Sequence, residues 1–162
     1  MHTTLILSID RRHTSEQALH IADVAVARRH LGVVGLDLCG DPSVGPISHL
    51  APAFAKARAA GLKLTLHFAE APASASDAEL WELLGWRPDR VGHAICVGEE
   101  VKREIVRRGV GLEICLSCNV LAGMSEGGFG GHCFGWWRGS GVGVALSVSV
   151  LSTVAGEGSG EM

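Results

Sequence analysis

Segments with the pattern of β-strands and segments with the pattern of helices alternate along almost the whole chain, and this alternation limits the possible folds more than any other feature. Strands are predicted at residues 5–10, 33–40, 64–70, 90–94, 112–119 and 142–149. Helices are predicted between them at residues 14–30, 48–60, 76–85 and 99–108, with a weakly helical stretch near residues 134–137. Such alternation predicts consecutive βαβ units and therefore a parallel sheet.

The predicted strands have one apolar face and one face of polar or small side chains. In residues 64–70, Leu64, Leu66 and Phe68 alternate with polar side chains that include Thr65 and His67. A strand of an antiparallel sheet has the same pattern, whereas the strands of an open doubly wound parallel sheet are almost entirely apolar. A (β/α) barrel explains both observations best, because its outward face packs on helices and its inward face carries functional groups at the carboxyl rim.

Composition restricts the class of protein. The 162 residues, 47% of them hydrophobic, predict one domain over residues 1–150, followed by a Gly/Ser-rich and disordered tail over residues 151–162. The net charge of −3, without a basic run, gives no electrostatic argument for nucleic-acid binding. No apolar run has the length of a membrane span and the N-terminus lacks the pattern of a signal peptide, so we expect a soluble, cytoplasmic protein.

Five cysteines in a chain without a secretion signal indicate reduced thiols rather than a disulfide framework. Cys115 and Cys118, with His132 and Cys133 further on, have the residue types of a structural zinc knuckle. However, Cys115 lies in a predicted strand, where a zinc-ribbon cysteine pair requires a turn. We therefore do not favour this interpretation.

The end of the third predicted strand contains a candidate catalytic pair. His67 is the last inward-facing residue of the strand, and Glu70 follows in the loop. An imidazole followed by a carboxylate suits a metal ligand beside a proton donor. His93 ends the next predicted strand and adds a second imidazole. Since His-x-x-Glu is also common at structural and solvated positions, the remaining motifs must decide whether this pair is catalytic.

Five segments in order resemble the adenosine deaminase family of zinc hydrolases. They are GLDLCGDP (35–42), LHFAE (66–70), RVGHA (90–94), LEICLSCNV (112–120) and the stretch of His132, Phe134 and Trp137. The segment LSIDRR (7–12) resembles the adenosine deaminase-like branch, which deaminates N6-methyl-AMP. The resemblance extends from residue 5 to about residue 147.

This resemblance implies a (β/α)8 barrel, of which the six predicted strands are similar to the third to the eighth. It implies hydrolytic deamination at C6 of a 6-aminopurine nucleoside or nucleotide, with Zn²⁺ as the cofactor. His67 would be a zinc ligand, Glu70 would protonate the purine ring nitrogen, and His93 would orient the attacking water. Gly40 would contact the substrate through its backbone. Alternation also places Asp10 on the inward face at a strand end, so we expect it to contact the substrate.

Two family motifs have no counterpart in the sequence. None of the eight histidines forms the family's His-x-His pair of zinc ligands, and Ser149 and Val150 replace two residues of its Thr-Asp-Asp motif. A catalytic zinc needs three protein ligands, and the resemblance supplies one. We therefore expect a partial barrel with unpaired edge strands. The alternative function is a catalytically inactive remnant that retains only ligand or partner binding.

Other residues allow two interpretations each. Arg11 and Arg12 fit either a phosphate-binding pair or a solvated pair before a helix. Asp37 is typical of a satisfied carboxylate in a barrel core, and the tryptophans at 136–137 are typical of packing rather than of base stacking. For His132 two interpretations remain open, a residue of a substrate loop and a structural residue.

Overall fold

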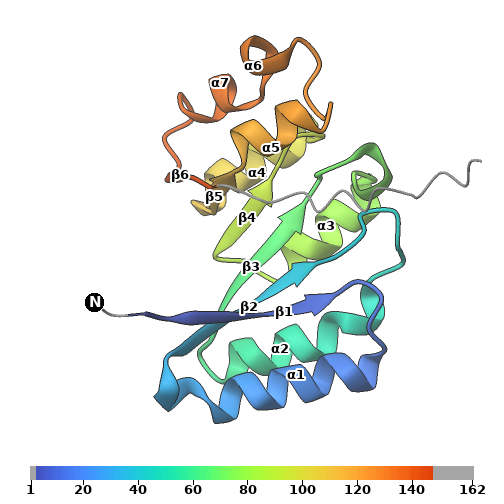
Figure 1. The fold of residues 1–162 in the computed structure, drawn as a ribbon, viewed down its shortest axis with the longest axis vertical. Helices are drawn as coiled ribbons and strands as arrows, with labels where there is room; N and C mark the ends of the chain where they lie inside the picture. The colour runs from blue at the N-terminus through green and yellow to red at the C-terminus, as the bar shows by residue number, and fades with distance from the viewer. Residues whose placement is uncertain (1–2, 148–162) are drawn as a thin grey trace, which may run out of the picture.

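Six parallel strands form one sheet in the order in which they occur along the chain (Figure 1). The structure is a computed structural model that describes residues 3–147. The strands are β1 (Leu5–Asp10), β2 (Val33–Cys39), β3 (Lys63–Phe68), β4 (Arg90–His93), β5 (Gly111–Ile114) and β6 (Val144–Leu146). Sequential order with right-handed crossovers places the connecting helices on a single face of the sheet.

The helices follow the local signals of the sequence. They are α1 (Ser15–Ala27), α2 (Ala51–Ala59), α3 (Asp77–Gly85), α4 (Glu99–Arg108), α5 (Leu116–Leu121), α6 (Gly128–Gly131) and α7 (Phe134–Trp137), with 3₁₀ turns at Arg29–Leu31, Ser48–Leu50 and Pro72–Ser74. Thr14 and Gln17 form a capping box at the start of α1, with bonds of 3.2 and 2.8 Å. Gly109, at φ +64°, ends α4 in the left-handed conformation that glycine adopts without strain.

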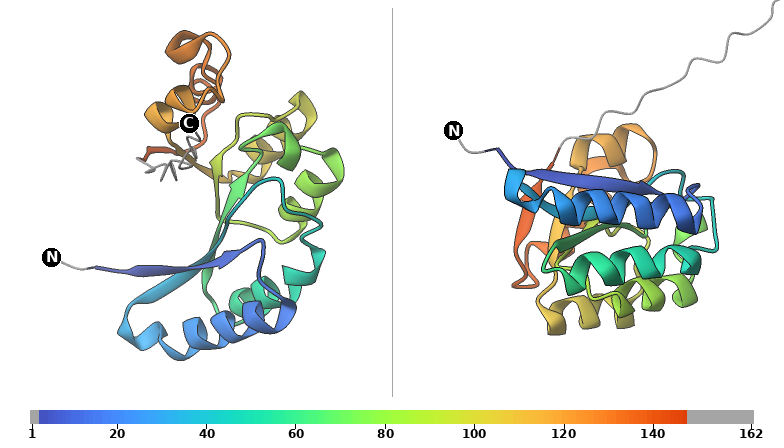
Figure 2. Two further views of the ribbon diagram at one scale, coloured as in Figure 1. Left: turned by 45° about the vertical axis from the view of Figure 1, so that its right-hand side comes forward. Right: turned by 90° about the horizontal axis from the view of Figure 1, so that it is seen from below.

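The helices cover one face of a curved sheet, which is an arc of a barrel. Figure 2 shows α1 and α2 side by side on the same side of the strands. Within residues 3–147, β1 pairs only with β2 and β6 pairs only with β5, so the sheet is not closed. The prediction of a partial (β/α) barrel with unpaired edge strands is therefore confirmed.

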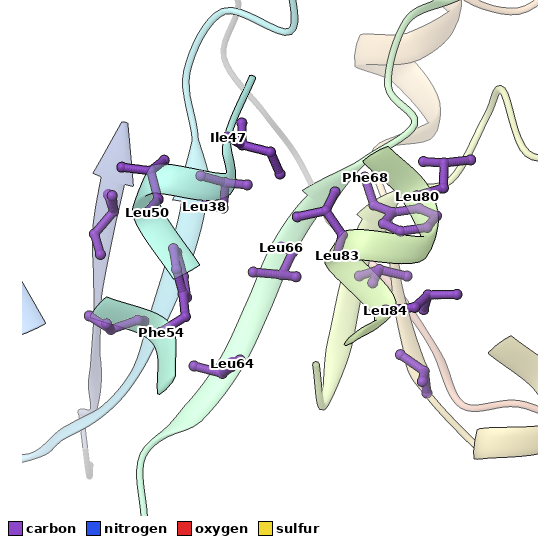
Figure 3. Packing of buried hydrophobic residues seen from close by; sticks show 14 of the residues in the cluster. Leu38, Ile47, Leu50, Phe54, Leu64, Leu66, Phe68, Leu80, Leu83 and Leu84 are labelled. Carbon is purple, nitrogen blue, oxygen red and sulfur yellow. The ribbon is translucent and has the colours of Figure 1, made fainter. Parts of the chain in front are cut away.

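The hydrophobic core lies between this face of the sheet and the helices (Figure 3). Leu38 of β2 and Leu66 of β3 pack there with Phe54 of α2 and Leu83 of α3, and all four side chains are fully buried. Each apolar side chain of this size contributes about 1.5–3 kcal/mol on complete burial. The core thus fixes which face of each strand turns away from the helices.

The opposite face of the sheet is polar, as the alternation predicts. Ser8 donates to Asp37 at 3.4 Å, and Arg90 pairs with Glu113 at 3.0 Å. The hydroxyl of Thr65 on β3 reaches Glu113 on β5 at 3.5 Å, past Gly92 of the intervening β4.

One predicted element is wrong. The strand predicted at residues 112–119 ends at Ile114, and a helical turn follows because the amide of Asn119 donates to the carbonyl of Cys115 at 2.9 Å. Cys115 and Cys118 therefore lie at the start of α5, where both are buried free thiols. No group of three or more metal-ligating side chains occurs in residues 3–147, so the cysteines form no zinc knuckle there.

The remaining differences are the short helix α6, which was not predicted, and the ends of elements. The predicted first helix stops at Ala27 and continues as a 3₁₀ turn. The last strand is confirmed only over Val144–Leu146, while Ser149, Val150 and the predicted tail at 151–162 lie outside the described residues. None of the helices in the described part of the chain combines the length and the apolar character that a bilayer span requires.

Candidate active site at the carboxyl edge of the sheet

The two histidines predicted for the site lie side by side at the ends of β3 and β4. The ring centroids of His67 and His93 are 5.2 Å apart, and the ring planes are tilted by 47°. His67 reaches this position by regular alternation, because its neighbours Leu66 and Phe68 point into the core.

His93 reaches the site through an irregular backbone. It is paired in register with Phe68, so a regular strand would turn it toward the helices. Instead, His93 and Ala94 have φ values of +63° and +49°, which residues other than glycine rarely adopt. The amide of Ala94 donates to the carbonyl of Phe68 at 3.0 Å, and the indole of Trp137 donates to the carbonyl of Ala94 at 3.2 Å. Backbone strain held in this way is concentrated at functional sites.

A carboxylate fixes the orientation of His67. Its Nδ1 lies 3.1 Å from Oδ1 of Asp37, whose other oxygen accepts the hydroxyl of Ser8. Burial favours the neutral imidazole, but the hydrogen bond to Asp37 and the nearby charge of Glu70 outweigh it and raise the pKa of His67 above its ordinary value. With Nδ1 occupied, Nε2 is the nitrogen available to a ligand.

An amide fixes the orientation of His93. Nδ2 of the fully buried Asn119 donates to Nδ1 of His93 at 3.0 Å, and Oδ1 of Asn119 accepts Nε2 of His132 at 3.3 Å. The proton of neutral His93 therefore lies on Nε2, which is 3.5 Å from Oε1 of Glu70. Burial lowers the pKa of His93, since the negative charge of Glu70 compensates only in part.

Asp10 and Gly40 form a separate pair on β1 and after β2, at the same edge of the sheet. Gly40 has φ +101°, and a Cβ atom there would lie 2.6 Å from Oδ1 of Asp10, so a larger residue would be strained and would displace the carboxylate of Asp10. The guanidinium of Arg12 binds both carboxylate oxygens of Asp10, at 2.9 and 2.7 Å. Hydrogen bonds from Arg12 lower the pKa of Asp10 to about 2.

The arginine pair that followed the first predicted strand separates into two different environments. Arg11 is buried and pairs with Glu79 at 2.5 Å, while it also donates to the carbonyl of Val44 at 3.1 Å. It is therefore a structural residue, neither solvated nor free to bind a phosphate. Arg12 keeps 70% of its side chain exposed at the rim of the sheet.

The structure brings His67, Glu70 and His93 together and adds two residues that the sequence did not assign to the site. Asp37 had a signal, because it is a carboxylate within an otherwise apolar strand, and its interpretation as a satisfied carboxylate is consistent with its two hydrogen bonds. Asn119 had no such signal in the sequence, because its segment was predicted as a strand. His132 is buried and is linked to His93 through hydrogen bonds of both residues to Asn119.

The donor set for a zinc ion is incomplete in the described residues. His67 fits as one ligand, because Asp37 holds Nδ1 and leaves Nε2 free, as is usual for histidines that bind metals. A catalytic zinc requires three protein ligands, and residues 3–147 contain no group of three such side chains. Residues 3–147 therefore do not make a zinc site by themselves.

Comparison with known proteins gives a consistent result. Residues 1–127 match the family model described as adenosine deaminase. N6-mAMP deaminase of Arabidopsis thaliana is 37% identical over 121 residues, which cover 75% of this chain and 33% of that relative. A crystal structure of Arabidopsis N6-mAMP deaminase superimposes with a TM-score of 0.84 at 33% identity, over 90% of this chain and 42% of the other.

A crystal structure of Arabidopsis ADAL complexed with GMP gives the same values, a TM-score of 0.84 at 33% identity over 90% of this chain and 42% of the other. The chain thus spans about a third to two fifths of the length of the relatives that it matches.

Proposed function

The chain belongs to the adenosine deaminase family, and from this membership we propose that its residues form part of the active site of an enzyme that hydrolytically deaminates a 6-aminopurine nucleoside or nucleotide. The proposal rests chiefly on one observation, the contact between the carboxylate of Glu70 and the buried imidazole of His93 beside His67. In this proposal a zinc ion is the cofactor of the whole enzyme, and His67 is one of its ligands.

Glu70 is the proposed proton donor to the purine ring. Water adds to C6 only when the neighbouring ring nitrogen accepts a proton, which requires a carboxylic acid opposite that nitrogen. Glu70 is partly buried, with 17% of its side chain exposed, and its Oε1 lies 3.5 Å from Nε2 of His93. Its carboxyl group thus lies at the candidate site, where the proposal requires a proton donor.

His93 is the proposed holder of the attacking water. Because Asn119 occupies Nδ1, the Nε2–H group of His93 points its proton toward Glu70 and the space beside His67. The lowered pKa keeps this imidazole neutral at neutral pH, so it orients the water without adding a positive charge next to the metal ligand.

A nucleotide is the favoured substrate class. Neighbouring strands are about 4.8 Å apart, and Arg12 lies beside Asp10 on β1, two strands from His67 on β3. An exposed guanidinium at the same edge of the sheet as the proposed chemistry suits the 5′-phosphate of a purine mononucleotide, as in N6-methyl-AMP. The Arabidopsis structure complexed with GMP supports this class.

The incomplete zinc ligand set favours a second candidate, in which the chain by itself binds purine nucleotide without turnover. An assay separates the two functions. Purified chain with added Zn²⁺ is incubated with N6-methyl-AMP or adenosine, and the purine absorbance is followed; binding of GMP is measured by calorimetry. Turnover that is lost in Glu70→Gln but retained in the control Glu16→Gln supports deamination.

Binding of GMP without turnover supports the second candidate, and its loss in Arg12→Ala supports the phosphate assignment. The absence of both turnover and nucleotide binding would contradict the proposal. Zinc analysis of the dialysed protein is the third measurement, because about one tightly held equivalent requires three protein ligands.

A further inference from the structure

A polar cavity lies at the edge of the sheet opposite the candidate active site. It has a volume of about 690 Å³ and lies among the ends of α2, α3 and α4 and the loop that leads into β4. Its charged lining consists of Arg58, Arg87, Asp89, Arg107 and Arg108. Each of these helices precedes a strand, so the cavity opens at the amino edge of the sheet, whereas His67 and His93 end their strands.

Positive charge exceeds negative charge around this cavity. Arg58 and Lys63 contact the carboxylate of Asp89 at 3.6 and 2.8 Å. Arg107 and Arg108 share Glu104, and their hydrogen bonds lower its pKa to about 2. Four arginines of the lining and the nearby Lys63 are thus balanced by two carboxylates, while the carboxyl ends of α2, α3 and α4 each add about −0.5 charge. About one and a half positive charges remain uncompensated, in a chain whose net charge is −3.

Helix capping accounts for only two of the four arginines. Arg108 donates to the carbonyl of Leu84 at 2.6 Å, and Arg58 donates to the carbonyl of Arg87, so both stabilise the end of α3. The side chain of Arg87 makes no hydrogen bond or ion pair with any described residue, and Nη1 of Arg107 is unused. These two guanidinium groups have no structural task in the described part of the chain beyond the contact with Glu104.

We propose that this cavity binds the di- or triphosphate group of a small molecule. Its volume falls within the range of about 300–1,000 Å³ that is usual for small-ligand sites. Guanidinium groups bind phosphate oxygens through paired N–H donors, and several of them around one cavity match a ligand with more than one phosphate. The lining comes entirely from residues 58–110, so the site is independent of the proposed deaminase activity and of its zinc.

Calorimetric titration of the full chain with inorganic tripolyphosphate tests the proposal. Arg87→Asn and Arg107→Gln are the informative variants, because neither removes a bond that caps α3, and asparagine tolerates the φ of +61° at position 87. We expect each variant to weaken binding about tenfold, and the double variant to bind about a hundredfold more weakly, which are typical losses for a charge-assisted hydrogen bond. Orthophosphate should bind more weakly than tripolyphosphate, and 0.5 M NaCl should weaken both.

Two control variants locate the bound anion. Arg28→Gln removes an arginine elsewhere on the surface and should leave the affinity unchanged, whereas Arg12→Ala reports whether the anion binds instead at the rim of the candidate active site. Loss of binding in Arg12→Ala with none in the Arg87 and Arg107 variants would overturn the proposal. An equal loss in all variants, or no measurable binding of tripolyphosphate at low salt, would also overturn it.

Discussion

The ends of β3 and β4 lie next to each other in the sheet, yet they place their side chains differently. Phe68 and His93 are paired in register, but Phe68 is buried in the core, whereas His93 turns into the candidate site. The two adjacent imidazoles also differ, because His67 is held by the carboxylate of Asp37 and His93 by the amide of Asn119. Strand periodicity thus places a side chain only while the backbone stays regular. Burial lowers the pKa of both imidazoles, and the carboxylate of Asp37 outweighs burial at His67, whereas burial prevails at His93.

The largest expected effect comes from the core side of this comparison. Phe68→Ala removes a fully buried ring and should lower the free energy of unfolding by about 3–5 kcal/mol. The same substitution at Phe129, which is 64% exposed, should change it by less than about 0.5 kcal/mol. Chemical denaturation followed by circular dichroism measures both. A similar loss in the two variants would show that the end of β3 is not packed as described.

Substitutions among the polar residues of the candidate site should lower the stability less than Phe68→Ala does, but they should change the orientation of the histidines. Asn119→Ala leaves Nδ1 of His93 and Nε2 of His132 buried without partners, which should cost about 1–3 kcal/mol of unfolding free energy. It should also release the orientation of His93. The same denaturation experiment checks the first effect, and the proton chemical shifts of the His93 ring check the second. An unchanged ring spectrum would refute the positioning role of Asn119.

Changing the hydrogen-bond partner of each imidazole should shift the two pKa values in opposite directions. Asn119→Asp gives His93 a carboxylate partner and should raise its pKa above 6.5, while Asp37→Asn should lower the pKa of His67 below its present raised value. Imidazole titration by NMR measures both. The expectation fails if either pKa stays where it is in the unsubstituted chain.

The same exchange should change how stability depends on pH. His67, whose pKa is raised, stabilises the fold below pH 6.5, and this contribution is lost as the pH rises through its folded pKa. His93, whose pKa is lowered, stabilises the fold above pH 6.5, and this contribution is lost as the pH falls through its folded pKa. In Asn119→Asp the contribution of His93 should therefore move to the acid side. Denaturation curves at pH 5.5 and 7.5 test this sign.

Local patterns were sufficient for most elements of the fold. The fourth helix was predicted at residues 99–108 and is found at Glu99–Arg108, because its apolar stripe is strong and Gly109 ends it. The faces of β3 were also predictable, since Leu66 and His67 follow strict alternation. The segment at 112–119 was not predictable, because its alternation continues past the point where the backbone turns into α5.

The residue types of the candidate site could be predicted from the sequence better than the contacts between them. His67, Glu70 and His93 follow from their positions at strand ends, and the parallel sheet brings those ends to one edge, but the contact of His93 with Glu70 depends on the irregular backbone at His93 and Ala94. The hydrogen bond of Asn119 to His93 joins residues 26 positions apart, through a helix that no local pattern indicated. The arginine cavity likewise combines the ends of three helices, each of which looks like an ordinary solvated surface in the sequence.

By itself, the sequence determined the order of strands and helices, the side of each strand that faces the core, and the chemical groups available at the carboxyl edge. These properties depend on periodicity and on residues close together in the chain. Only the tertiary structure decided that His93 turns inward against its register, that Asp37 and Asn119 orient the two imidazoles, and that four arginines surround one cavity. The reason is physical: the strain of a left-handed residue and the excess of positive charge around a cavity both depend on groups that only folding brings together.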